Sequence, residues 1–185
     1  GGMMLGSIYT LFPIFLVKLE STQEHISLIM MTVVLGGMFL QIPIGKISDM
    51  IDRRVVILTV STCLLITSAI ICLNYEGMSM FLVLVFIFGG GAFVLYPLSI
   101  SHACDFLEES ETLSAIGVIT IFYGLGSVFS PILVSASMNL FGPFGFFIVT
   151  LIVSMLVCGY TLYRMSLREA SPDTAQFTAL TPKSI

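Results

Sequence analysis

The chain has 185 residues, of which 57% are hydrophobic and 10% are charged, and its mean hydropathy is +1.07. A soluble domain carries about 25% charged residues, so this composition excludes that class and predicts a protein of the lipid bilayer. The net charge of -4 identifies no partner, and the absence of a basic cluster argues against binding to nucleic acid.

Six apolar stretches are each long enough to cross the hydrocarbon core as a helix, which takes about 20 residues. They are expected at Gly1 to Val17, Ile26 to Ile44, Val55 to Leu73, Met78 to Ser101, Leu113 to Met138 and Phe144 to Tyr163. The chain begins with Gly-Gly-Met-Met, so we expect the first stretch to be clipped at its start, and no signal peptide is predicted. Residues 1 to 165 are expected to form the helical bundle, and the polar residues Ser166 to Ile185 a disordered cytoplasmic tail.

Lysine and arginine predict the orientation of the chain in the membrane. Lys18 lies alone in a connection on one side, whereas all the other basic residues lie on the opposite side, after the second and sixth stretches: Lys46, Arg53, Arg54, Arg164, Arg168 and Lys183. Both ends of the segment are therefore expected in the cytoplasm. The acidic connection with Asp105, Glu108, Glu109 and Glu111 is expected there too, because acidic residues contribute little to orientation.

The charged loop from Gly45 to Arg54 joins the second and third stretches. We expect Gly45 to let one helix end pack tightly against the next, and Asp49 to place a carboxylate beside the first turn of the following helix. Arg53 and Arg54 are expected at the boundary between lipid and water, where any short inside loop also carries arginines. The spacing G-x-x-x-D-x-x-x-R-R resembles the signature loop of the major facilitator superfamily of membrane transporters. Asp52 stands where that family usually has a glycine, and we expect it to cap the next helix or to pair with an arginine.

This resemblance implies the C-terminal six-helix half of a twelve-helix transporter, made of two inverted three-helix repeats. The residues themselves show only the number and length of the helices and no internal repeat. The resemblance also implies a partner, the N-terminal six-helix half, that is missing from this segment. The glycines and tyrosine of the first stretch, Tyr96-Pro97 and the acidic connection are similar to a group of bacterial members, so a bacterial inner membrane is expected.

Polar and small residues recur at helical spacing within the apolar stretches. By the resemblance, the first and fourth stretches line a central cavity, and the candidates for contact with a solute are Tyr9, Gln41, Tyr96, Ser99 and Tyr123. The alternative is that these polar groups only bond to neighbouring helices and that the glycines only permit close packing. The runs Gly89 to Pro97 and Gly124 to Pro131 are candidate hinges.

No acidic or basic residue lies in the middle of a predicted span. The candidates for a proton relay are therefore His102 and Asp105, at the end of the fourth stretch, although a histidine there also suits a helix C-terminus without any relay. The four isolated cysteines, Cys63, Cys72, Cys104 and Cys158, are expected to be reduced packing residues. No metal site and no cofactor are predicted.

We therefore expect a secondary active transporter that moves a small neutral or amphipathic solute by alternating access. The charged loop is expected to act as a cytoplasmic latch, in which Asp49 and Arg53 hold neighbouring helix ends together in the outward-facing state. An enzyme is not expected, because the chain has no Gly-x-Ser-Gly nucleophile, no H-E-x-x-H zinc site and no repeated aspartates. The alternative is a membrane scaffold or sensor that transports nothing, since helices that only pack have a similar sequence.

Overall fold

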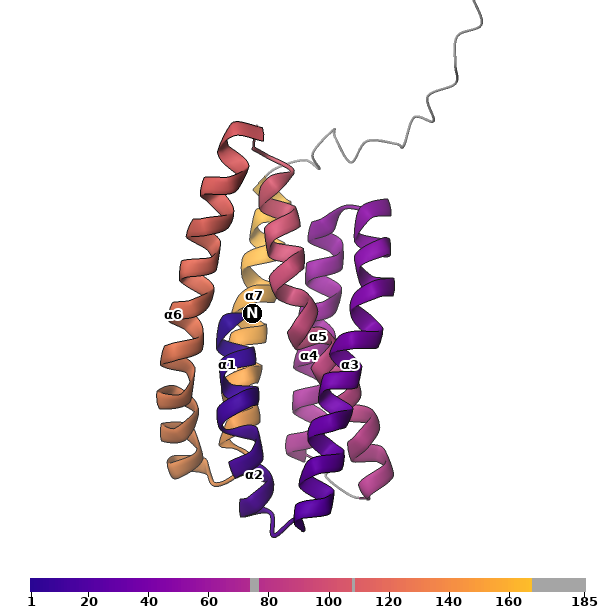
Figure 1. Cartoon of the computed structure of the whole chain (residues 1–185), viewed down its shortest axis with the longest axis vertical. Coiled ribbons are helices and arrows are strands. Elements are labelled where there is room, and N and C mark those ends of the chain that lie inside the picture. The colour runs from indigo at the N-terminus through magenta and orange to yellow at the C-terminus, as the bar shows by residue number, and fades with distance from the viewer. Residues whose placement is uncertain (74–76, 108, 168–185) are drawn as a thin grey trace, which may run out of the picture.

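A computed structural model describes residues 1–73, 77–107 and 109–167, and every regular element in these ranges is an α-helix. The helices are α1 (Gly2–Thr10), α2 (Phe12–Lys18), α3 (Gln23–Met50), α4 (Arg53–Leu73), α5 (Met78–Cys104), α6 (Glu109–Phe141) and α7 (Gly145–Leu167). Figure 1 shows a bundle in which the long helices α3 to α7 alternate in direction. The all-α class is thus confirmed. The expected tail lies outside the described residues, except that Ser166 and Leu167 belong to α7.

Five of the described helices, α3 to α7, are long and apolar enough to cross a membrane. The first predicted span is instead divided into α1, with nine residues, and α2, with seven, so neither helix reaches the length of a span. Pro13 lies in the first turn of α2 and has no N–H to donate to the carbonyl of Tyr9, which interrupts the helical ladder between the two. Figure 1 shows that α1 begins near half the height of the bundle and runs toward the end at which α3 begins.

The long helices extend beyond the apolar stretches that predict them. Helix α3 continues to Met50 and α4 begins at Arg53, so that only Ile51 and Asp52 separate the two helices. The charged loop, expected as a ten-residue turn, is therefore mostly helical. Hydropathy marks where side chains leave the lipid, whereas the backbone hydrogen bonds of a helix continue into water wherever the residues are good helix formers.

A cluster of five phenylalanines forms the core at the end of the bundle opposite the charged loop: Phe12, Phe15, Phe88, Phe146 and Phe147. All five side chains are fully buried. The ring centroids of Phe12 and Phe146 lie 5.2 Å apart, as do those of Phe15 and Phe147, whose rings meet edge to face. Such pairs add about 0.5–1.5 kcal/mol each beyond the burial of their area, so the cluster fastens the short α2 to α5 and α7.

Helices α3 and α5 cross so closely that only glycine fits between them. A Cβ on Gly36 would overlap the carbonyl of Phe86, and a Cβ on Gly89 would overlap the carbonyl of Val33. Helix α5 runs without a break through the whole candidate hinge Gly89 to Pro97. The glycines of that run are buried against neighbouring helices, so close packing accounts for them without any bend.

Helices α1 and α6 make a second crossing of the same kind. A Cβ on Gly2 would overlap the carbonyl of Tyr123, and a Cβ on Gly6 would lie 2.5 Å from the carbonyl oxygen of Ser127. The hydroxyl of Ser127 donates a hydrogen bond of 2.9 Å to the carbonyl of Gly2. Helix α6 continues through the second candidate hinge, Gly124 to Pro131, and uses part of it for this contact.

Candidate functional site

Arg53 connects three helices at the loop end of the bundle. Its Nη1 lies 2.9 Å from Oδ1 of Asp49 in the last turn of α3, and its Nε lies 2.7 Å from Oδ2 of Asp105, the residue that follows α5. Nη1 also donates to Oγ of Ser48 at 3.4 Å. The Nε–H makes no hydrogen bond of good geometry to any residue that the structure describes, so the contact with Asp105 is an ion pair defined by distance. We call Asp49, Arg53 and Asp105 the ionic latch.

Asp52 and Arg54 form a second pair beside the latch. Oδ1 of Asp52 accepts a hydrogen bond of 2.9 Å from the backbone N–H of Arg54, which caps the first turn of α4. Oδ2 accepts one of 2.7 Å from Nη2 of the same arginine, which is 8% exposed. Hydrogen bonding to the Arg54 guanidinium holds the pKa of Asp52 below its usual value, although partial burial opposes this. Asp52 therefore does both things that the sequence suggested for it: it caps a helix and pairs with an arginine.

Two other expectations for the charged loop are not met in the described structure. Asp49 lies within α3 and pairs with Arg53, so the carboxylate that caps α4 is that of Asp52. A Cβ added to Gly45 would meet no atom within 4 Å, so this glycine makes no close helix contact. Both differences arise because α3 continues through the loop: Gly45 and Asp49 remain in α3, and the Asp49 carboxylate reaches the Arg53 side chain while Asp52 accepts the hydrogen bond from the first turn of α4.

Replacing Asp52 by Ala is expected to destabilise the fold by about 1 to 2 kcal/mol, because the mutation removes a helix cap and leaves the buried Arg54 without this carboxylate. The Asp52 pKa is depressed in the folded state, so the stabilisation is present above the unfolded pKa of about 3.9 and is lost as the pH falls through the folded value. Unfolding in detergent at neutral and acidic pH measures both effects. Asp52→Asn is the control that keeps a cap and removes the charge. A constant gap between Asp52→Ala and wild type down to strongly acidic pH would contradict the assignment.

Three of the five solute candidates line one hollow of about 310 Å³ between α1, α5 and α6: Tyr96, Ser99 and Tyr123. We call it the tyrosine hollow. The rings of Tyr96 and Tyr123 lie 4.2 Å apart between centroids, and the Tyr96 hydroxyl lies 2.8 Å from Oγ1 of Thr120. Thr120 was not among the candidates, although it shares a helical face with Tyr123 in the sequence. The hollow thus combines two aromatic faces with the Ser99 hydroxyl, and Thr120 bonds to the Tyr96 phenol.

The other two solute candidates lie elsewhere. Tyr9 packs its ring against Phe93 of α5 at 6.0 Å between centroids and remains 57% exposed. Gln41 lines a separate hollow of about 170 Å³, together with Asp49 and Arg53 of the ionic latch. The structure therefore brings Gln41 to the charged loop and not to the tyrosines.

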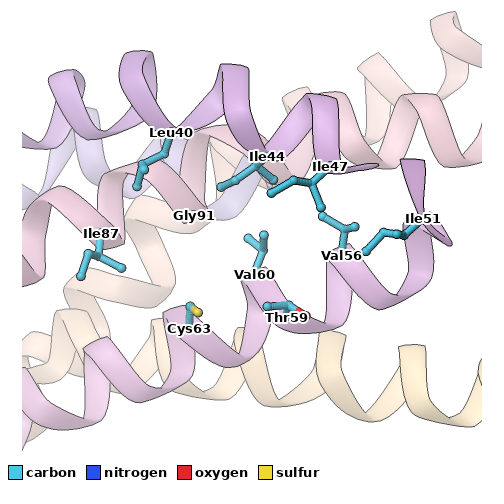
Figure 2. Close-up of a pocket in the computed structure, with 10 residues that line it drawn as sticks. All are labelled: Leu40, Ile44, Ile47, Ile51, Val56, Thr59, Val60, Cys63, Ile87 and Gly91. Atoms are coloured by element: carbon cyan, nitrogen blue, oxygen red, sulfur yellow. The ribbon is translucent and has the colours of Figure 1, made fainter. Parts of the chain in front are cut away.

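A larger cavity, of about 350 Å³, lies between α3, α4 and α5 (Figure 2). Its lining is almost entirely aliphatic, and only Thr59 and Cys63 bring a polar atom in a side chain. A site for a polar or amphipathic solute needs a few polar groups to orient it. This cavity has no such set, so its size does not make it the stronger candidate.

The two relay candidates are not hydrogen-bonded to each other in the described part of the chain. Asp105 pairs with Arg53 in the ionic latch. The His102 ring packs edge to face on Phe106, with 5.2 Å between centroids, and lines a different cavity between α4, α5 and α7. The four cysteines are free thiols, and of these Cys63 is exposed.

Comparison with known proteins places these features in context. The model of the Major Facilitator Superfamily matches residues 1–184. The curated protein "Uncharacterized MFS-type transporter YcaD" of Escherichia coli O17:K52:H18 (strain UMN026 / ExPEC) is 30% identical over 155 residues, which are 84% of this chain and 40% of that protein. The protein of the same name from Salmonella arizonae is 30% identical over 130 residues, which are 70% of this chain and 33% of that protein. The chain thus spans less than half the length of these relatives.

Proposed function

Because the chain belongs to the major facilitator superfamily, a family of membrane transporters and not of enzymes, we propose that it forms the C-terminal half of a secondary transporter. An N-terminal half of six helices would complete the molecule, in keeping with the 40% of the relative's length that the chain covers. The complete protein would move a small solute by alternating access. Both ends of the segment would face the cytoplasm of a bacterial cell, since the lysine and arginine residues gather there.

The tyrosine hollow is the observation that carries this proposal. Polar groups within a membrane bundle are costly unless they pair or line a water-filled path, and here two phenols and the Ser99 hydroxyl line a hollow between three helices, while Thr120 bonds to one of the phenols. Among the residues that the structure describes, no charged side chain lines the hollow. Aromatic faces and neutral hydroxyls suit a neutral or amphipathic solute, and the missing half would supply the opposite wall.

The helix contacts support two inverted repeats, one formed by α1 to α4 and the other by α5 to α7. The first, second and third helices are α1 with α2, α3 and α4 in one unit, and α5, α6 and α7 in the other. When the two units are exchanged, the crossing of α1 with α6 becomes the crossing of α5 with α3. These are the two glycine crossings described above. The same exchange returns the packed pair α4–α7 to itself. In this assignment α1 and α2 together are the first of six spans.

The ionic latch would hold the loop end closed while the tyrosine hollow faces outward. Arg53 would release Asp105 when the transporter opens inward, because α5 carries Asp105 while α4 carries Arg53. The predicted relay of His102 and Asp105 would act in the open latch, where Arg53 no longer engages the Asp105 carboxylate. In this proposal one ion pair serves both gating and proton coupling.

Cysteine labelling tests whether the hollow belongs to a water-filled path. In the full transporter with its native cysteines replaced, Ser99→Cys and Tyr123→Cys are expected to react with a water-soluble maleimide, and substrate is expected to slow the reaction. Leu156→Cys is the matched control, because this residue of α7 is 68% exposed on an apolar surface that would face lipid. Equal labelling at all three positions, or none at the hollow, would favour the alternative of a scaffold or sensor whose helices only pack.

A further inference from the structure

Another polar cavity, of about 260 Å³, lies between α4, α5 and α7 at the loop end. Its polar lining comes from all three helices: Arg54, Ser99, His102, Tyr160, Thr161 and Arg164. It shares Ser99 with the tyrosine hollow and no other residue, and it contains neither α1 nor α6. The proposed transport site therefore does not account for it.

The charges around this cavity do not cancel. Arg54 is neutralised by Asp52, and Arg53, outside the cavity, is engaged by Asp49 and Asp105. Arg164 has no carboxylate within 4 Å in the described ranges, and the lining of the cavity contains no acidic side chain. The cavity thus holds an excess of positive charge.

The chemistry of the lining suits an oxyanion. Arg164, Tyr160 and Thr161 each carry a donor, since a guanidinium offers a planar set of N–H groups and the phenol and hydroxyl each offer an O–H. A guanidinium matches the oxygens of a phosphate in pairs, and such charge-assisted bonds are about twice as strong as neutral ones. Ile57 and Val157 give the cavity apolar walls, which reduce the competition from water.

We propose that this cavity binds a phosphate group, with Arg164 as its main ligand and His102, Tyr160 and Thr161 as further donors. The phosphate belongs either to the headgroup of an anionic phospholipid in the adjoining leaflet or to a free phosphate in water. The competing explanation is that Arg164 only extends from the end of α7 to the membrane surface, as arginines near helix ends do. Binding at this site does not depend on transport, so the two proposals can fail separately.

Native mass spectrometry of the full chain in detergent tests the proposal with phosphatidylglycerol, and a thermal shift tests it with inorganic phosphate. Arg164→Gln removes a cation from the cavity and, separately, His102→Gln removes the ring donor. Lys46→Gln is the matched control, because it removes one positive charge from the same end of the bundle but lies outside the cavity. We expect Arg164→Gln to weaken binding about tenfold, which corresponds to about 1.4 kcal/mol, and Lys46→Gln to leave binding unchanged.

The two probes distinguish the source of the phosphate. If the wild-type chain retains phosphatidylglycerol but not phosphatidylcholine, and Arg164→Gln no longer retains phosphatidylglycerol, the phosphate is that of a lipid headgroup. A shift with inorganic phosphate that Arg164→Gln abolishes, without lipid retention, identifies a free phosphate. Binding as tight in Arg164→Gln and His102→Gln as in wild type overturns the proposal. Equal weakening by Lys46→Gln, or no binding of either probe to wild type, overturns it as well.

Discussion

Arg53→Asp is expected to lower transport by the full protein at least about tenfold. The mutation turns two attractive contacts, with Asp49 and Asp105, into repulsions at the point where α3, α4 and α5 meet. A change of only 1.4 kcal/mol in the balance between outward-facing and inward-facing states alters their ratio tenfold. Uptake or efflux of substrate by membrane vesicles measures the rate, and surface expression confirms that the variant is made and inserted.

The two partners of Arg53 are expected to differ in weight. The side chain of Asp49 is 68% exposed and that of Asp105 is 28% exposed, and exposed ion pairs contribute little. Asp49→Lys should therefore impair transport less than Asp105→Lys does, and Arg53→Asp combined with Asp105→Arg should restore part of the activity. Lys46→Asp, a charge reversal outside the latch, is the matched control. Normal transport by Arg53→Asp would remove the latch from the mechanism.

Among the glycine-to-alanine substitutions in the bundle, Gly36→Ala is expected to lower the stability most. The new Cβ would overlap the backbone carbonyl of Phe86, so α3 and α5 would have to separate along their whole contact. Overpacking of this kind costs about 1–3 kcal/mol and sometimes more, and at this chain length each kcal/mol lowers the Tm by about 2–4 °C. Thermal unfolding in detergent followed by circular dichroism measures the change.

Gly159→Ala is the matched control for this substitution. It adds the same methyl group to the exposed face of α7, where a Cβ meets no atom within 4 Å. Alanine is a better helix former than glycine by about 1 kcal/mol, so this variant should be as stable as wild type or slightly more stable. Equal melting temperatures for Gly36→Ala and Gly159→Ala would show that α3 and α5 adjust to the extra methyl group without strain.

Hydropathy was sufficient to predict five of the membrane helices, because burial in lipid demands long apolar runs. Hydropathy did not predict the division of the first stretch into α1 and α2, because the stretch is apolar throughout, although Pro13 was a signal for it. The helix ends could not be predicted from the same pattern. Lys46 and Asp49 lower the hydropathy of the charged loop, yet both remain in α3, since a charged residue ends a lipid contact without ending a helix.

The candidate site was predicted in part. Tyr96 and Tyr123 could be grouped because the family resemblance implies that their helices contribute to a central cavity, and the structure brings their rings together. Gln41 has the same kind of polar group but faces the charged loop, and its direction depends on the rotation of α3, which the glycine crossing sets. The partner of Asp105 was equally hidden, because an ion pair between residues 53 and 105 depends on how α4 packs against α5. Periodicity along one helix carries no information about such rotations.

The phenylalanine cluster and the ionic latch lie at opposite ends of the bundle, and this gives the bundle a stiff end and a compliant end. Interlocked buried rings resist small displacements, because a shift of less than an ångström already forfeits part of their dispersion energy. Ion pairs that water can reach lose little energy over the same displacement, and salt weakens them further. Thermal motion is therefore distributed unevenly over the height of the molecule. The end that can change shape at low cost is the end that holds the ionic latch, and ionic strength changes the strength of the latch without changing the packing of the buried rings.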